Sequence, residues 1–148
     1  MHYVVEQDGL LLSTDPAQLD RAWLFHELSE EAYWSPGLPA ERFDSMLQHS
    51  LCFGLYRNGV QLGFARAVTD YATFAYLADV VVRAECRGQG LGQWMMQGVL
   101  AHPRLQQLRR MMLVTRDAHT LYRRFGFEAT AAPANVMEKR DLSLYRQA

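Results

Sequence analysis

Short apolar runs separated by turn dipeptides mark the strands at the start and middle of the chain. The first pair is residues 3–6 and 10–13 around Asp8-Gly9, and the second is residues 51–57 and 60–68 around Asn58-Gly59. Asp-Gly and Asn-Gly between such runs favour tight hairpin turns. The pattern therefore predicts two β-hairpins.

Between these hairpins the apolar spacing changes to that of helices. Asp15 followed by Pro16 is a typical helix start, with the carboxylate as N-cap and proline in the first turn. The apolar face that follows predicts a helix up to about residue 33. A break rich in proline and glycine follows, and a second helix begins after Pro39, with Phe43 on its apolar face.

A β-branched run at residues 77–82 predicts a buried strand, and the spacing over residues 91–101 predicts a helix packed on one face. Gly88, Gly90 and Gly92 lie between the two. A strand, a glycine-rich turn and a helix N-terminus gather unpaired N–H groups at one point. This stretch therefore predicts a binding site for an anion, most simply a phosphate.

The kind of phosphate ligand is narrowed by what the glycine turn lacks. It has no Gly-Lys-Ser/Thr ending, which excludes a Walker-type loop. A dinucleotide fingerprint would need glycine or alanine where Gln93 stands. It would also need an acidic residue about twenty positions further on, where the chain has Met111 and Met112. The dinucleotide interpretation is therefore disfavoured.

After this unit the pattern predicts a strand at residues 111–115 and a short helix at residues 117–125, with Asp117 as its N-cap and Gly126 at its end. Weaker strand signals occur at residues 128–131 and 135–139. No internal repeat or linker interrupts the order, so we expect residues 1–148 to form a single domain.

Composition places the chain among globular proteins, with 49% hydrophobic and 21% charged residues. A net charge of −1 gives no reason to expect nucleic acid or an anionic membrane as partner. The chain shows neither a membrane-length apolar run nor a signal-peptide pattern, so we expect a cytoplasmic protein. Cys52 and Cys86 are too few and too far apart for a disulfide framework or a zinc site, and we expect no metal.

Two motifs resemble those of the GNAT N-acetyltransferase superfamily. Arg87, Gly90 and Gly92 match its acetyl-CoA loop, and residues 121–127 match its Leu-Tyr-x-x-x-Gly-Phe signature. Residues 69–79 are similar to a group of small single-domain bacterial members. The resemblance implies an α/β (α+β) fold with a mixed, mostly antiparallel central sheet of about six or seven strands, flanked by about four helices. It also implies a splay between the family's fourth and fifth strands, here residues 77–82 and 111–115.

The resemblance implies acetyl-CoA as the cofactor and assigns a set of residues to it. The pantetheine arm would run along a strand backbone and the pyrophosphate would sit on the glycine turn, which gives the set Val80, Val81, Val82, Arg87, Gly88, Gln89, Gly90, Leu91 and Gly92. Many members carry asparagine at the position of Thr115. A hydroxyl offers one donor where an amide offers two, so the cofactor contact at Thr115 differs from the family's.

For catalysis, Tyr122 matches the family's tyrosine acid. Its free pKa of about 10 is close to that of a thiol, so proton transfer to the departing thiolate is expected to be nearly balanced. Asp79 is the first candidate for the base, because an acid inside an apolar strand is costly without a task or partner. The alternative is a purely structural carboxylate. His119 and Glu27 are further candidates, and Cys86 has no evident base.

The acceptor is expected to be a small-molecule primary amine with an apolar or aromatic part. The residues expected to bind it combine aromatic surface with an acid, and they are Glu27, Tyr33, Trp34, Tyr71 and Phe74. Alternatives are a protein or peptide N-acetyltransferase, a non-catalytic acyl-CoA sensor and a nucleotide-binding module. Family members are often dimers, so a homodimer is a further expectation.

Overall fold

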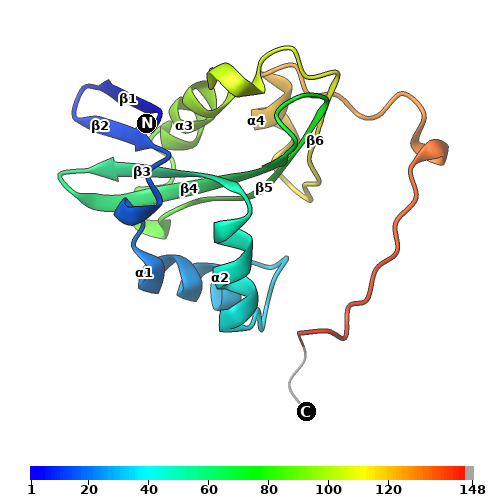
Figure 1. Ribbon diagram of the computed structural model, residues 1–148, viewed down its shortest axis with the longest axis horizontal. Coiled ribbons are helices and arrows are strands. Elements are labelled where there is room, and N and C mark those ends of the chain that lie inside the picture. The colour runs from blue at the N-terminus through cyan, green and yellow to red at the C-terminus, as the bar shows by residue number, and fades with distance from the viewer. Residues whose placement is uncertain (146–148) are drawn as a thin grey trace.

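The computed structural model describes residues 1–145 and contains one six-stranded sheet, with the strands in chain order from β1 to β6 (Figure 1). Neighbouring strands are antiparallel except β5 and β6, which are parallel. The strands are β1 (Val4–Gln7), β2 (Leu10–Ser13), β3 (Leu51–Arg57), β4 (Val60–Thr69), β5 (Phe74–Val82) and β6 (Arg110–Met112).

Both hairpins predicted from the sequence are confirmed. Asp8 and Gly9 connect β1 to β2 with φ angles of 53° and 82°. Asn58 and Gly59 connect β3 to β4 with φ angles of 52° and 77°. Positive φ at both central residues is the requirement of a type I′ turn, which Asn-Gly and Asp-Gly tolerate best.

Helices cover both faces of the sheet (Figure 1). α1 (Arg21–His26), the π-helical turn η2 (Glu27–Glu31) and α2 (Ala40–Gln48) lie on one face, and α3 (Leu91–Leu100) and α4 (His119–Arg123) on the other. Two cores result, one with Phe64 and Val81 under the first group and one with Phe53 and Met95 under the second. No helix within residues 1–145 has the length and hydropathy needed to cross a membrane.

The single helix predicted from Pro16 to about residue 33 is wrong in detail. The segment divides into a 3-10 turn η1 (Pro16–Gln18), then α1, then η2. Asp15 does cap the first turn by accepting from the Ala17 amide, as predicted. However, Leu19 is extended, and Asp20 caps a new helix by accepting from the Trp23 amide. A second capping carboxylate five residues after the first is enough to restart the helix.

The predicted splay is confirmed. Within residues 1–145, β6 pairs with β5 only at Phe74, Ala75 and Tyr76, so residues 77–82 of β5 have no strand partner on that side among the described residues. The predicted strand at residues 111–115 is correspondingly too long, because residues 113–115 leave the sheet. We call the space beside residues 77–82 the β5 gap.

The two weak strands predicted near the C-terminus are wrong. Residues 128–145 contain no strand, only the 3-10 turn η5 (Pro133–Asn135), a bend at residue 131 and a turn at residues 142–145. Figure 1 shows this segment, in orange and red, leaving the domain beyond α4 and returning below the sheet. We call residues 128–145 the arm. Two further 3-10 turns complete the described elements, η3 (Ala84–Cys86) and η4 (Pro103–Leu105).

Candidate active site

The glycine turn after β5 presents free backbone to solvent. Gly88 and Gly90 have φ angles of 80° and 77°, and a Cβ built on either would meet no atom within 4 Å. Gly90 is the N-cap residue of α3 and has no side chain to cap it. Within residues 1–145 the amides of Gly88, Gln89 and Gly90 donate to no protein acceptor. These groups and the first amides of α3, at Leu91 and Gly92, lie together at the helix N-terminus, which is the arrangement that favours an anion.

Arg87 connects this turn to both the strand and the first helical layer. Its Nε donates to the carbonyl oxygen of Val82 at 3.1 Å, and its Nη2 lies 3.4 Å from Oε1 of Glu27. The Arg87 side chain is 61% exposed, whereas the Glu27 side chain is only 8% exposed. An exposed cation therefore covers a buried carboxylate, which is costly to leave unpaired.

Val80, Val81 and Val82 hold the strand in place while one edge of its backbone stays open. Val81 packs in the core beneath α1 and α2, and Val80 and Val82 pack on the opposite core. Val81 and Val82 pair with β4 through Phe64 and Gly63. Their other edge faces the β5 gap, where an extended ligand could pair as an added strand.

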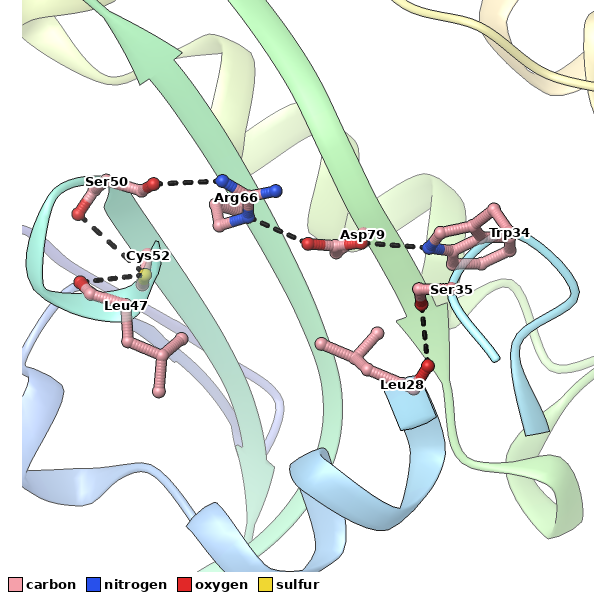
Figure 2. Close-up of polar contacts among 8 residues, drawn as sticks. All are labelled: Leu28, Trp34, Ser35, Leu47, Ser50, Cys52, Arg66 and Asp79. Carbon is pink, nitrogen blue, oxygen red and sulfur yellow. Dashed lines mark hydrogen bonds and ion pairs between the residues drawn. The ribbon is translucent and has the colours of Figure 1, made fainter. Parts of the chain in front are cut away.

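Asp79 lies at an irregularity of β5 and is held by two donors (Figure 2). Its φ angle is 54°, and its Oδ2 accepts from Arg66 Nε at 2.7 Å. Its Oδ1 accepts from Trp34 Nε1 at 2.8 Å. The side chains of Asp79 and Arg66 are 8% and 16% exposed. Both oxygens are thus engaged by groups that fix a bulge and a loop, so the contacts favour the structural alternative over the base.

Tyr122 projects from α4 into the core that contains Val80 and Val82. Burial is the main cause that raises its pKa to about 12, and nearby Tyr33 and Asp117 add to this. The raised pKa moves the phenol further from the pKa of a thiol than the nearly balanced proton transfer expected from the sequence requires. A phenol that stays protonated suits hydrogen-bond donation instead.

Tyr33 and Trp34, in the loop after η2, lie beside β5, where Trp34 donates to Asp79. Their rings meet edge to face at 4.9 Å, and each residue is 43% exposed. The Tyr33 hydroxyl accepts from the Arg116 amide at 3.1 Å, and the Arg116 guanidinium lies 3.7 Å from the Tyr33 ring centroid. The loop after η2 is thereby joined to the segment after β6. Tyr33, Trp34 and Tyr122 thus lie around the β5 gap.

Thr115 has a local role that the sequence did not reveal. Its Oγ1 accepts from the Ala118 amide at 3.0 Å, at the entry to α4. α4 begins at His119 with Ala118 as N-cap residue, so the prediction of Asp117 as the cap is wrong. The Thr115 hydroxyl uses one of its two acceptor lone pairs in this turn and keeps its proton and the other lone pair for a ligand.

Two predicted acceptor residues lie apart from this group. Tyr71, in the turn between β4 and β5, stacks under the guanidinium of Arg104 at 3.9 Å. Phe74 begins β5, pairs with Arg110 and accepts through its carbonyl from Thr69 Oγ1. Both positions are at the end of β5 remote from the glycine turn. Within residues 1–145, no hydrogen bond or ring contact joins Tyr71 or Phe74 to Tyr33 or Trp34.

The two cysteines and His119 complete the set of candidate residues. Cys52 is buried, and burial raises the pKa of its thiol to about 12, which keeps it an unreactive core residue. Cys86 lies half-buried in η3, and His119 is exposed on α4. In the part of the chain that the structure describes, no group of His, Cys, Asp and Glu could hold a metal ion.

Two important residues escaped prediction, namely Arg66 and Arg116. Arg66 lies in an apolar strand, which is the same signal that singled out Asp79, and the two could have been paired on that ground. Arg116 is an ordinary polar loop residue by sequence. Its stacking on Tyr33 depends on how the segment after β6 leaves the sheet, which no local pattern encodes.

Comparisons with known proteins agree on one family. The model of the Acetyltransferase (GNAT) family matches residues 17–127. A predicted acetyltransferase from Gibberella zeae is 39% identical over 134 residues, which span 76% of this chain and 75% of that protein. A crystal structure of a predicted GNAT-family acetyltransferase from Xanthomonas campestris has a TM-score of 0.91 and 42% identity, and covers 96% of this chain and 100% of that one. An Elizabethkingia anophelis GNAT acetyltransferase with acetyl-CoA bound has a TM-score of 0.64 at 16% identity, with coverage of 89% and 88%.

Proposed function

Because the chain belongs to the GNAT acetyltransferase family, we propose that it moves an acetyl group from acetyl-CoA directly to a primary amine of a small molecule. The observation that carries this proposal is the joined arrangement of free amides at Gly88 to Gly90 and an open backbone edge at the β5 gap. An anion site next to an unpaired strand edge fits a ligand with a phosphate end and an extended amide-containing arm.

The residues present fit coenzyme A. The space where Cβ atoms of Gly88 and Gly90 would stand is open, so a diphosphate can approach the backbone closely. Arg87 stands beside this cradle with an exposed side chain that can turn from Glu27 to an anion. Bound acetyl-CoA would supply the activated acetyl thioester. The Elizabethkingia relative, whose structure contains acetyl-CoA, supports the same ligand for this fold.

In this proposal Tyr122 donates a hydrogen bond toward the leaving sulfur. With its pKa raised to about 12, the phenol holds its proton across the physiological range. It therefore stabilises developing negative charge as a preorganised donor, without becoming a phenolate. Tyr122 would hold its own proton throughout and solvent would supply the proton of the thiol product, so no charged tyrosine has to form in the buried site.

Glu27 replaces Asp79 as the group that receives the amine. It is a buried carboxylate whose partner Arg87 is a long, exposed contact at 3.4 Å. Once Arg87 turns to the diphosphate, Glu27 is left without its cation and can pair with an incoming ammonium group. Accepting a proton from that group would free the neutral amine for attack. Asp79, by contrast, is held by Arg66 and Trp34.

The acceptor in this proposal carries an apolar or aromatic part. Tyr33 and Trp34 are both exposed at the rim of the β5 gap, which provides an aromatic surface beside the acid. Aromatic rings bury large area and orient a planar ligand. Tyr71 and Phe74 would contact only an acceptor long enough to reach along β5.

The test is a thiol-release assay of the purified chain with acetyl-CoA across a library of amines, together with calorimetry of acetyl-CoA binding. We expect heat of binding and turnover with small aromatic or apolar amines. Turnover of peptide N-termini alone would mean that the acceptor is a peptide or protein and not a small-molecule amine. Binding of acetyl-CoA without turnover of any amine would identify an acyl-CoA sensor. Binding of ATP or NAD without binding of CoA would identify a nucleotide module and refute the proposal entirely.

A further inference from the structure

Arg116 is attached to Tyr33 by two separate contacts. Its backbone amide donates to the Tyr33 hydroxyl at 3.1 Å, and its guanidinium carbon lies 3.7 Å from the centroid of the Tyr33 ring. Stacking on a ring holds the planar face of a guanidinium and leaves the N–H donors along its edge free. Residue 116 is exposed, so a ligand can reach this edge.

The Arg116 guanidinium has no acidic partner within residues 1–145, because none of the ion pairs there includes it. The two other arginines next to the candidate site are engaged. Arg66 pairs with Asp79 at 2.7 Å, and Arg87 pairs with Glu27 at 3.4 Å. Arg116 is therefore a fixed cation whose charge the described part of the chain does not neutralise.

The ring under Arg116 belongs to the loop that follows Glu27 and its helical turn. Ser35 Oγ donates to the Leu28 carbonyl oxygen at 2.6 Å, as Figure 2 shows. This bond folds the loop back on η2, so Tyr33 stays close to the turn that contains Glu27. A carboxylate and a guanidinium are thus positioned by the same loop.

This loop is also attached to the edge of the β5 gap. Trp34 Nε1 donates to Asp79 Oδ1 at 2.8 Å (Figure 2). Tyr33 lies near enough to Tyr122 to contribute to the raised pKa of that phenol. The cation on Tyr33 therefore borders the same gap as the proposed hydrogen-bond donor to the leaving sulfur.

The balance of charge indicates which anion suits Arg116. Once Arg87 has turned to the diphosphate, Glu27 can pair with the ammonium group of the acceptor. Among residues 1–145, Arg116 is then the arginine that contacts the loop without an acidic partner. Its fork of parallel N–H donors matches the two oxygens of a carboxylate, and one positive charge balances one negative charge. A phosphate carries about 1.5 to 2 negative charges at neutral pH and would stay unbalanced.

We propose that the amine acceptor is an aminocarboxylic acid, namely a free amino acid with an aromatic or apolar side chain, whose carboxylate binds Arg116 while its ammonium group meets Glu27. Tyr33 and Trp34 contact the side chain of the amino acid. This inference rests on the proposed acetyl transfer and names its acceptor class. It adds Arg116 to the substrate-binding residues.

The transfer step itself stays the same for this acceptor. The amine nitrogen forms a bond to the acetyl carbon, and the bond from that carbon to sulfur breaks. The nitrogen loses two protons in total. One leaves through Glu27 to solvent, and the other is balanced by protonation of the thiolate.

The test measures kcat/KM for amino acids and for the amines that lack only the carboxylate, such as phenylalanine with phenethylamine and leucine with isopentylamine. We expect the wild-type protein to prefer the amino acid by on the order of 10- to 100-fold, the effect of a charge-assisted hydrogen-bond pair. Arg116→Gln should remove this preference, with kcat/KM for phenethylamine changed by no more than about threefold. Comparing the preference between variant and wild type cancels the different basicity of the two amines.

The matched control is Arg104→Gln. Arg104 also stacks on a tyrosine, Tyr71, at 3.9 Å, and also has no ion pair within residues 1–145, but it lies at the end of β5 remote from the glycine turn. Its replacement should leave the preference for amino acids unchanged. An equal loss of preference in Arg104→Gln and Arg116→Gln would refute a specific role of Arg116.

Several outcomes would overturn the inference while acetyl transfer stands. One is a wild-type protein that acetylates phenethylamine as well as phenylalanine. Another is an Arg116→Gln variant that loses both activities equally, which would mean that Arg116 only holds Tyr33. A third is faster turnover of phosphoethanolamine than of any amino acid, which would assign the cation to a phosphate.

Calorimetry of amino acids with the CoA-saturated protein provides a readout that needs no turnover. We expect phenylalanine to bind the wild-type protein and to lose on the order of 10-fold or more in affinity in Arg116→Gln. If no amine is acetylated but this binding is observed, acetyl transfer fails and the amino-acid site stands. If amino acids are neither bound nor acetylated, the inference is refuted.

Discussion

The cofactor side and the acceptor side of the candidate site are built from different chemical groups of the chain. The cofactor side uses backbone: the amides of Gly88 to Gly90 and the open edge of β5. The acceptor side uses side chains: Glu27, Tyr33 and Trp34, which the π-helical turn η2 and the following loop bring over the sheet. Backbone geometry is encoded locally by glycine and strand patterns. Side-chain geometry depends on contacts between residues far apart in the chain, so a local sequence pattern does not determine it.

The largest effect is expected at the backbone side. Gly90→Val should lower acetyl-CoA affinity by on the order of 100-fold, because a β-branched side chain disfavours a φ of 77° and its methyl groups fill the diphosphate cradle. Calorimetry measures this directly. Gly59→Val is the matched control, since Gly59 has the same φ of 77° and equally open space but lies in the turn after β3. Equal loss of affinity in both variants would mean that general instability is the cause.

The next largest effect is expected where the two sides meet. Tyr122→Phe should reduce kcat by on the order of 100-fold through loss of a preorganised donor, with little change in acetyl-CoA affinity. Tyr56→Phe is the control, because the Tyr56 hydroxyl is buried without a partner and its removal should leave turnover unchanged. If Tyr122→Phe retains normal kcat with a good amine, the tyrosine only packs against Phe127.

On the acceptor side, Glu27→Gln should raise KM for the amine by about 10-fold, the change expected for losing one charge-assisted hydrogen bond. Acetyl-CoA affinity should stay the same or improve, because Arg87 is released from its carboxylate partner. Glu31→Gln, on the same helical turn but exposed, serves as control for charge alone. Loss of acetyl-CoA binding in Glu27→Gln would place Glu27 on the cofactor side and contradict its proposed role.

The Asp79→Asn variant distinguishes a structural role of Asp79 from a role as the catalytic base. Because the buried pair with Arg66 loses its charge, we expect the free energy of unfolding to fall by about 1–3 kcal/mol, as measured by denaturant titration. Turnover below the melting range should change by no more than about threefold, since the amide keeps an acceptor for Arg66. A loss of turnover on the order of 100-fold in a folded variant would restore Asp79 as the base.

The smallest effect concerns pH. Tyr122 has a folded pKa of about 12, above its ordinary value of 10, so its protonated form persists below pH 12 and is lost only as pH rises through that value. The pH profile of kcat/KM should therefore rise as the amine loses its proton and show no falling limb from Tyr122 below about pH 11. A falling limb near pH 9 that disappears in Tyr122→Phe would mean that the phenol is a stronger acid than its burial implies.

The sequence predicted most of the fold because its strongest signals are local. Hairpins followed from Asp8-Gly9 and Asn58-Gly59, and the glycine turn after β5 followed from Gly88 and Gly90. The splay of β5 from β6 came from the family resemblance alone. The family itself was identified correctly on the same motifs. The hairpins and the glycine turn need only nearest-neighbour chemistry, so one sequence contains the information for them.

What the sequence did not reveal depends on contacts over long separations. The pairing of Arg66 with Asp79 and the stacking of Arg116 on Tyr33 form only once the sheet exists. The helix predicted to run to residue 33 failed because Asp20 offers a second cap, and a periodic apolar face does not show where a chain restarts. The strand signals in the arm failed because a strand needs a partner edge, which β-propensity alone does not supply.

The short register of β5 with β6 leaves the backbone that follows it with little protection. Within residues 1–145, Phe74, Ala75 and Tyr76 pair with Arg110, Met111 and Met112, and residues 113–115 have left the sheet. α4 is held beyond this point by side-chain packing, with Tyr122 buried in the core beneath α3. The amides of residues 113–115 should therefore exchange with solvent faster than those of the two hairpins, since no strand ladder shields them.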